Sequence, residues 1–264
     1  MKKNIPPVDL DLLTFAVNTA KEAGELTLNY FKNTDLVVEG KGDGTPVTEA
    51  DRGAERLMRT LIHESFPNDT IKGEEESDLI GTSERSWVLD PIDGTMSFIH
   101  GVPLYGNLIS MEDEYGPAIG VINIPALGEC VFAGRGRGCY FNDELTQVSE
   151  STTLDGSCIV TSGVDYWPST EILNRFAQNG AVIRTWGDAY GYVLVATGRA
   201  DAMIDPIGRV YTNKNGGYKY SENTVLEIGF QEAWNQVSCG FDENRFHQRN
   251  GDWDWNRETI GGEA

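Results

Sequence analysis

The segment WVLDPIDGT, residues 87–95, constrains this chain more than any other. Its apolar start is typical of a buried strand, which then ends in Asp90 and Asp93 with a proline between them. Pro91 fixes one backbone dihedral, and the following glycine lets the chain approach a ligand closely. The two carboxylates can therefore point the same way, with the Ile92 carbonyl between them. One aspartate is enough to stabilise a turn, so the presence of two indicates that they have a common function.

Further carboxylates lie in two other loops. The run GEEE, in which Glu74 is the first glutamate, follows a short strand-like segment, and Asp51 opens a predicted helix. If these loops converge with residues 90–93, they form an oxygen-rich site, which suits a hard divalent cation such as Mg²⁺. Two alternatives stay open. Asp51 follows Thr48 by three residues and can instead belong to a helix cap, and the other two glutamates of GEEE are interpreted as solvated acids.

Net charge narrows the classes of partner. The chain has 21 Lys and Arg against 41 Asp and Glu, which gives a formal net charge of −20. That balance argues against a nucleic-acid backbone or an anionic membrane as the main partner. It would also repel an anionic substrate, unless a bound divalent cation reverses the field locally.

The amino-terminal segment and the cysteines indicate the compartment. The opening MKKNIPPVDLDLL has no apolar signal-peptide core, and no run approaches the roughly 18 apolar residues of a membrane span. The four cysteines show neither CxxC nor Cys/His ligand spacing, so we expect reduced structural thiols and no zinc site. These features predict a cytoplasmic protein.

Helical and extended patterns alternate along the chain. Helical patterns cover residues 13–31 and 54–62. Two hairpin patterns follow, in residues 107–125 and 129–143, and the basic GRGRG of the second is interpreted as a solvated turn in preference to an anion site. Strand and helix patterns then alternate over residues 158–205. This order predicts layered α and β structure, not a simple parallel α/β fold.

Three motifs, GEEE, WVLDPIDGTMSFIHGVP and GRADAMID, resemble in order and spacing the signatures of the inositol monophosphatase family, from about residue 10 to about residue 208. The resemblance implies an α+β fold, a layered αβαβα sandwich, often dimeric, that hydrolyses small phosphate monoesters with Mg²⁺. We therefore expect residues 1–150 to form an N-terminal α+β half with the metal site. Residues 151–264 would form a C-terminal α/β half with the specificity residues.

The resemblance also implies roles for single residues. The oxygens that would hold the metal ions are those of Glu74, Asp90, Ile92 (backbone carbonyl), Asp93 and, more weakly, Asp51. Gly94 and Thr95 would meet the phosphate with backbone donors, and the Thr95 hydroxyl would orient the attacking water. Glu74, Asp93 and Thr95 are thus the predicted catalytic residues.

Substrate choice would depend on the segment GDAYGY, which resembles the histidinol-phosphate phosphatase branch of the family. The implied substrate-binding residues beyond the phosphate are Gly187, Asp188, Ala189 and Asp205. A carboxylate suits a substrate that carries an amine and an imidazole, because charge-assisted hydrogen bonds are the stronger ones. Inositol offers only hydroxyls. The alternative is that Asp188 is simply the N-cap of the following helix.

The chain departs from the family pattern after about residue 208. Thr212 stands where the family places a metal-binding aspartate, and the atypical C-terminal segment that follows has no clear helical period. We expect a homodimeric phosphatase that acts on a small phosphorylated metabolite, histidinol phosphate in histidine biosynthesis, without a nucleic-acid or membrane partner. The alternatives are an inositol-1-monophosphatase, or a catalytically weakened binding or regulatory relative.

Overall fold

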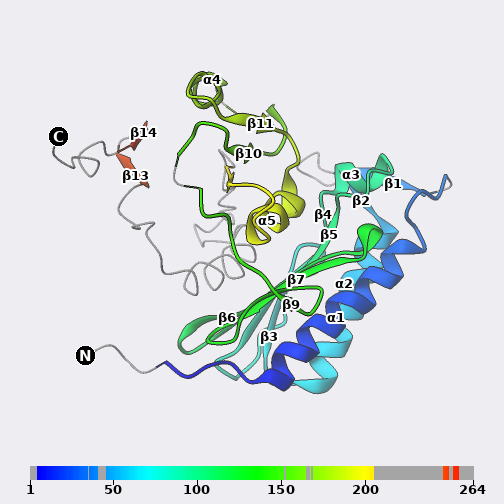
Figure 1. The fold of residues 1–264 in the computed structure, drawn as a ribbon. Helices are drawn as coiled ribbons and strands as arrows, with labels where there is room; N and C mark the ends of the chain where they lie inside the picture. Colours follow the sequence, from blue (N-terminus) through cyan, green and yellow to red (C-terminus); the bar gives the residue numbers. More distant parts are fainter. Residues whose placement is uncertain are drawn as a thin grey trace.

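The structure, a computed structural model, describes residues 5–34, 36–40, 46–151, 153–164, 167 and 169–204, together with the backbone of 246–249 and 252–255. The helices are α1 (Leu10–Leu28), α2 (Glu49–Ser65), α3 (Thr95–Ile99), the 3₁₀ turn η1 (Pro125–Leu127), α4 (Glu171–Gln178) and α5 (Asp188–Ala196). Figure 1 shows how they are arranged around the sheets. In the described part of the chain, no helix combines the length and the apolar character that crossing a membrane requires.

The first layer consists of α1 and α2, which lie side by side on one face of the large sheet (Figure 1). Small buried residues, Ala16, Ala20 and Ala23, let α1 pack closely on the sheet. The helical pattern had predicted a helix through residue 31, but α1 ends at Leu28. Phe31 packs instead against the rings of a separate apolar cluster beneath α3.

The second layer is a seven-stranded sheet in the order β3-β4-β5-β6-β7-β8-β9. Its strands are β3 (Thr70–Gly73), β4 (Ser86–Asp93), β5 (Gly106–Asp113), β6 (Gly116–Ile124), β7 (Glu129–Gly134), β8 (Gly138–Phe141) and β9 (Glu144–Leu145). β3 pairs with β4 in parallel, and every later pair is antiparallel, including both predicted hairpins. On β5, Ile109 belongs to the core beneath α1 and α2, whereas its neighbour Leu108 belongs to the core on the opposite face.

Three further layers complete the fold. α5 covers the second face of the large sheet through Ala189 and Val193, while its Leu194 packs against a second sheet. That sheet is parallel, in the order β11 (Val182–Arg184), β10 (Cys158–Val160) and β12 (Ala202–Met203). α4 covers its outer face, where Phe176 packs near Ile159. The result is the layered αβαβα sandwich that the sequence predicted.

Two hairpins lie outside these layers. β1 (Val38–Gly40) pairs with β2 (Pro46–Thr48), immediately before α2. β13 (Phe246–Arg249) pairs with β14 (Asp252–Trp255). The predicted boundary at residue 150 falls between β9 and β10, and the division into two halves stays a prediction.

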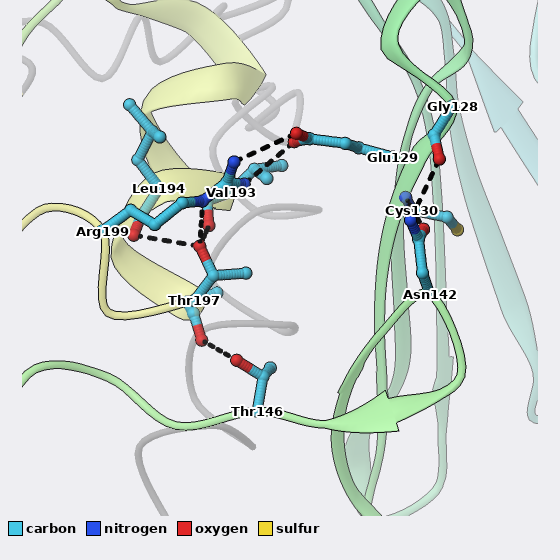
Figure 2. A network of polar contacts seen from close by, with 10 residues as sticks. Gly128, Glu129, Cys130, Asn142, Thr146, Val193, Leu194, Thr197 and Arg199 are labelled. Atoms are coloured by element: carbon cyan, nitrogen blue, oxygen red, sulfur yellow. Dashed lines mark hydrogen bonds and ion pairs between the residues drawn. The ribbon is translucent and has the colours of Figure 1, made fainter.

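A polar network ties the C-terminal end of α5 to the large sheet (Figure 2). Arg199 donates to both carboxylate oxygens of Glu129 at 3.0 and 2.9 Å, and its Nε donates to Thr197 at 2.8 Å. The Thr146 hydroxyl donates to the carbonyl of Ala196 at 3.3 Å. The bonds therefore reach the C-terminal end of α5 from β7 and from the residue that follows β9.

The basic turn differs from its predicted solvated state. Both guanidinium nitrogens of Arg135 pair with the carboxylate of Asp113, at 2.9 and 2.5 Å, and Nε of Arg137 donates to the carbonyl of Val8 at 2.7 Å. The turn is therefore only partly solvated, because Gly136 at its tip is exposed whereas both arginines are half-buried and bind neighbouring segments.

The three described cysteines are free thiols, as predicted; Cys239 lies outside the described residues. Burial raises the pKa of Cys130 and of Cys139 to about 12, so both stay protonated at neutral pH. They behave as small apolar core residues.

The double-sided burial of the large sheet gives a first prediction. Leu108→Ala should lower the free energy of unfolding by about 2–5 kcal/mol, because it removes a fully buried side chain between β5 and α5. Urea denaturation measures the change. The matched control is Leu145→Ala, at a side chain that is 73% exposed, where we expect a change within about 0.5 kcal/mol. Equal effects would contradict the layer assignment.

Candidate active site

The site is built on a break in the regular pairing of β4. The strand continues through the DPID motif, farther than the sequence pattern predicted, but its register with β5 shifts between Asp90 and Asp93. β4 has neighbours on both sides. The pairing with β3 ends at Leu89, so Pro91, which has no N–H to donate, lies beyond that pairing and within the irregular stretch opposite β5. The shift places Asp90 and Asp93 on a bulged backbone, with the buried residues Pro91 and Ile92 between them.

A chain of buried amides supports the bulge. Nδ2 of Asn107 donates to the freed carbonyl of Pro91 at 2.7 Å, and Oδ1 of Asn107 accepts from Asn123 at 3.1 Å. Nδ2 of Asn123 also donates to the carbonyl of Ala20 at 3.2 Å. Both asparagines are buried, with Asn107 fully so. The position of the DPID backbone thus depends on side chains from two neighbouring strands and on α1.

Strand register brings Glu74 to the same edge as Asp90. β3 and β4 run in parallel with Gly73 opposite Leu89, so the next residue on each strand lies at the same level, at the carboxyl ends of both. Asp90 is buried, whereas Glu74 is exposed. Two of the predicted metal-binding acids therefore occupy one edge of the sheet.

Asp93 links this edge to α5. Its Oδ2 accepts a hydrogen bond from the backbone N–H of Ala189, in the first turn of α5. The N-terminus of a helix carries a partial positive charge and free N–H groups, which favour a carboxylate there. The structure thus joins two motifs that are 96 residues apart in the sequence.

Asp188 lies beside Gly94, in the segment that is predicted to bind phosphate. Its Oδ2 is 3.2 Å from the place that a Cβ on Gly94 would occupy. The Ser162 hydroxyl accepts from the backbone N–H of Asp188 at 3.2 Å and donates to its Oδ1 at 3.4 Å. Gly187 permits this packing, because a Cβ there would come within 2.3 Å of the Cα of Ser162.

The alternative that Asp188 is the helix N-cap was wrong. Gly187 is the N-cap, and it has no side chain that could cap the helix. Asp188 is the first helical residue and has φ +54°, a left-handed conformation that few non-glycine residues adopt. Its carboxylate lies near Gly94 and Ser162, and the N–H of Ala189 in the first turn is instead bound by Asp93.

Thr95 and the Ile92 carbonyl meet directly, since the Thr95 hydroxyl donates to that carbonyl at 3.1 Å. Gly94, with φ +77°, makes the tight turn between them. The side chain of Ile92 is buried with Phe98 and Tyr105, which anchors the motif from below. Burial also raises the pKa of Tyr105 to about 12.

Asp51 takes the cap role that the sequence left open. Its Oδ2 accepts from the backbone N–H of Thr48 at 2.8 Å and from the Thr48 hydroxyl at 2.6 Å, which completes a capping box for α2. Its neighbour Ala50 packs in the same cluster as Ile92, so the start of α2 adjoins the DPID motif. Asp205 and Thr212 lie outside the described residues.

Sequence reasoning missed three residues that shape this region: Asn107, Ser162 and Glu55. Glu55 is a fully buried acid that contacts the GEEE loop. A signal for it was present, because Glu55 follows Asp51 by four residues and precedes Arg59 by four, which places all three on one helix face. Asn107 carried no such signal, since its partner Pro91 is fixed only by strand pairing.

The donors at this edge suit a hard divalent cation. Glu74, Asp90 and Asp93 offer carboxylate oxygens, and no described thiol or imidazole accompanies them in a cluster. Within the described residues, no three His, Cys, Asp or Glu side chains form a ready-made metal cage. Hard cations of the Mg²⁺ type are commonly held by one or two carboxylates, with water and substrate oxygens as the other ligands. The donor chemistry therefore fits such an ion.

Comparison with known proteins agrees with this geometry. The model of the inositol monophosphatase family matches residues 9–209. The chain belongs to the inositol monophosphatase family. Its members are phosphoric monoester hydrolases that depend on metal ions and act on small phosphorylated substrates.

Several curated relatives cover most of the chain. A protein named histidinol-phosphatase from Chlorobaculum parvum is 46% identical over 198 residues, which is 74% of this chain and 76% of the relative. A Streptomyces coelicolor protein of the same name is 36% identical and covers 76% of this chain and 79% of the relative. A Thermotoga maritima protein named fructose-1,6-bisphosphatase/inositol-1-monophosphatase is 31% identical, over 74% of this chain and 75% of its own length.

Solved structures of the family share the fold. A Thermotoga maritima IMPase is 26% identical, has a TM-score of 0.69, and covers 87% of this chain and 100% of its own. The extragenic suppressor protein suhB from Bartonella henselae is 25% identical, with a TM-score of 0.71, over 88% of this chain and 100% of its own.

The amide chain beneath the bulge gives a second prediction. Asn107→Leu should strongly destabilise the protein, because it leaves the Pro91 carbonyl and a donor of Asn123 buried without a partner, at about 1–3 kcal/mol for each group. Urea denaturation measures the loss. Ser110→Ala is the control on the same strand. The Ser110 hydroxyl is buried and has no hydrogen-bond partner among the described residues, so its removal should cost little. Equal losses would show that Asn107 does not support the bulge.

Proposed function

We propose that this protein is a Mg²⁺-dependent phosphatase that hydrolyses histidinol phosphate, in which Asp188 recognises the cationic part of the substrate. The observation that carries the proposal is the position of the Asp188 carboxylate, beside Gly94 and at the start of α5. A phosphate held by the backbone of Gly94 and Thr95 would leave the organic part of the substrate next to that carboxylate.

The proposed metal ligands are Glu74, Asp90, the Ile92 carbonyl and Asp93, with Asp51 nearer a weaker site. A bound Mg²⁺ supplies positive charge for the phosphoryl oxygens and lowers the pKa of the attacking water. Residues of the chain orient the reacting groups. The backbone N–H groups of Gly94 and Thr95 orient the phosphate, and the Thr95 hydroxyl, which already lies against the Ile92 carbonyl, orients the water.

Asp188 favours histidinol phosphate over an inositol phosphate. Histidinol carries an amine and an imidazole, so a carboxylate beside it can form charge-assisted hydrogen bonds, which are roughly twice as strong as neutral ones. Ser162 holds Asp188 through two hydrogen bonds, and therefore limits its rotamers before the substrate arrives. The relatives named histidinol-phosphatase support the same substrate.

The proposal extends to assembly and compartment. We expect a homodimer in the cytoplasm that needs neither nucleic acid nor membrane. The net charge of −20 argues against nucleic-acid and membrane partners, and the free thiols of Cys130, Cys139 and Cys158 are consistent with the cytoplasm, where cysteines stay reduced. The homodimer is what the resemblance to the family implies.

Loss of a single charge should abolish the reaction. We expect Asp93→Asn to reduce Mg²⁺-dependent phosphate release from histidinol phosphate nearly to background, because an amide keeps the shape of the side chain and loses the charge that binds the ion. Circular dichroism should show a folded protein. The control is Asp11→Asn, an exposed acid on α1 that changes the net charge equally and should keep full activity. Full activity of the unchanged protein in the presence of a chelator, or of Asp93→Asn in the presence of Mg²⁺, would refute the proposed metal chemistry.

Selectivity provides a separate test. In the unchanged protein, kcat/KM should be higher for histidinol phosphate than for inositol 1-phosphate. Asp188→Asn should narrow that ratio by about 10- to 150-fold, the equivalent of one hydrogen bond to a charged group, about 1.5–3 kcal/mol. Asparagine tolerates the left-handed backbone of this position, so the fold should persist.

The remaining outcomes separate the alternatives. A preference for inositol 1-phosphate that Asp188→Asn does not change would favour an inositol-1-monophosphatase, the name of a 31% identical relative. No release from any phosphate monoester, at any Mg²⁺ concentration, would favour a weakened binding or regulatory protein. This alternative is motivated by a relative from Pseudomonas aeruginosa that is 31% identical and is named Nus factor SuhB.

A further inference from the structure

Glu55 is a buried charge for which the proposed chemistry has no direct use. It lies on α2, and its side chain is 0% exposed. Its Oε2 accepts from the backbone N–H of Glu75 at 2.7 Å. Its Oε1 accepts from the backbone N–H of Glu76 at 3.0 Å and from Nε of Arg59 at 2.7 Å. One carboxylate thus binds two consecutive amides of the GEEE loop.

A buried carboxylate is costly unless charge and hydrogen bonds compensate for lost water. Glu55 has both, in the guanidinium of Arg59 and in the two loop amides. Those amides follow Glu74 directly in the chain. Glu55 therefore fixes the backbone immediately after the residue that strand register places beside Asp90.

α2 and the GEEE loop pack so closely that no side-chain atom fits at Gly73. A Cβ on Gly73 would come within 2.2 Å of Oε1 of Glu55 and 2.7 Å of Nη2 of Arg59. Nη2 of Arg59 also donates to the carbonyl of Glu76 at 3.0 Å. The loop is therefore held on both sides of Glu75 by the same pair of side chains.

We propose that Glu55 is a positioning residue that holds the GEEE loop in the geometry that allows Glu74 to bind a divalent cation. The inference rests on the proposed function, in which Glu74 is a metal ligand. Glu55 itself does not touch the ion or the substrate. Its effect should be on metal affinity, because partners that orient metal ligands commonly change that affinity by about 10- to 100-fold.

The test compares two buried acids, Glu55 and Asp69, whose partners lie near opposite ends of the β3–β4 pair. Glu55→Gln keeps the side-chain shape, but the NH₂ group of its amide takes the place of one carboxylate oxygen. That NH₂ group cannot accept a hydrogen bond from the N–H group that it would face. Asp69→Asn is the matched control. Asp69 is also buried and also accepts three hydrogen bonds, from Ser83 at 2.7 Å and from Arg85 and Trp87 at 2.9 Å each. These partners lie at the start of β4, away from the GEEE loop.

Two measurements on the full chain separate positioning from general stability. In metal-free protein, NMR hydrogen exchange reports on the amides of Glu75 and Glu76, which should lose protection in Glu55→Gln and keep it in Asp69→Asn. A Mg²⁺ titration followed by amide chemical shifts then gives the dissociation constant. We expect it to rise about 10- to 100-fold in Glu55→Gln and to stay within about twofold in Asp69→Asn. The phosphate-release rate of Glu55→Gln should recover at high Mg²⁺.

The outcomes distinguish this inference from the proposed function. Normal Mg²⁺ binding by the unchanged protein, with the same affinity in Glu55→Gln, overturns the inference alone. Equal weakening in Glu55→Gln and Asp69→Asn also overturns it, because the effect would then be general. No Mg²⁺ binding by the unchanged protein overturns the proposed function and, with it, the metal role of Glu55. If Glu55→Gln does not fold, Glu55→Asp replaces it. This variant keeps the charge but withdraws the carboxylate from the loop, and we expect the same weakening.

Discussion

The proline in the middle of β4 is the constraint on which the site depends. Pro91 lies beyond the end of the pairing between β3 and β4, and the register of β4 with β5 shifts around this residue, which has no N–H to donate. The break costs backbone hydrogen bonds, and Asn107 restores one of them from the side. The end of β4 is therefore irregular, but side-chain hydrogen bonds hold it in place. A rigid, irregular backbone can present Asp90, the Ile92 carbonyl and Asp93 in one direction, which a regular strand, with its alternating faces, cannot do.

The position of α5 follows from two attachments at its opposite ends. At the N-terminus, the N–H of Ala189 meets the Asp93 carboxylate. Near the C-terminus, the paired oxygens of Glu129 hold Arg199, which also lies over the rings of Phe141 and Tyr190 (Figure 2 shows the polar part). Because both ends are tied to the large sheet, the helix transmits the sheet geometry to Asp188. The predicted specificity residue Asp188 is thus positioned by the same sheet that carries the predicted metal-binding acids.

The sequence was sufficient for the elements and the family, because apolar periodicity and the DPIDGT spacing are local signals. It was insufficient where long-range packing decides. The cap role of Asp51 was an open alternative, since the same spacing serves a capping box and a ligand. The cap role of Asp188 was a wrong alternative, because only its left-handed backbone turns the carboxylate toward Gly94. The role of Asn107 could not be predicted from spacing, because its partner Pro91 is brought near only by strand pairing. For Glu55, spacing indicates the helix face that it shares with Arg59, but its contact with the GEEE loop depends on the folded structure.

An acid beside a phosphate site needs a physical justification, because it repels the phosphate. The net charge of −20 is a minor part of the problem, since charges beyond the Debye length of about 8 Å are screened at physiological salt. Asp188 is closer than that to Gly94 and is not screened away. Its repulsion can be offset at one end by a metal ion on the acidic edge of β4. At the other end, a positive charge on the substrate would offset it. A neutral polyol would offer that carboxylate weaker hydrogen bonds. On the proposed function, the residue that selects a cationic organic group would therefore also discriminate against a neutral one.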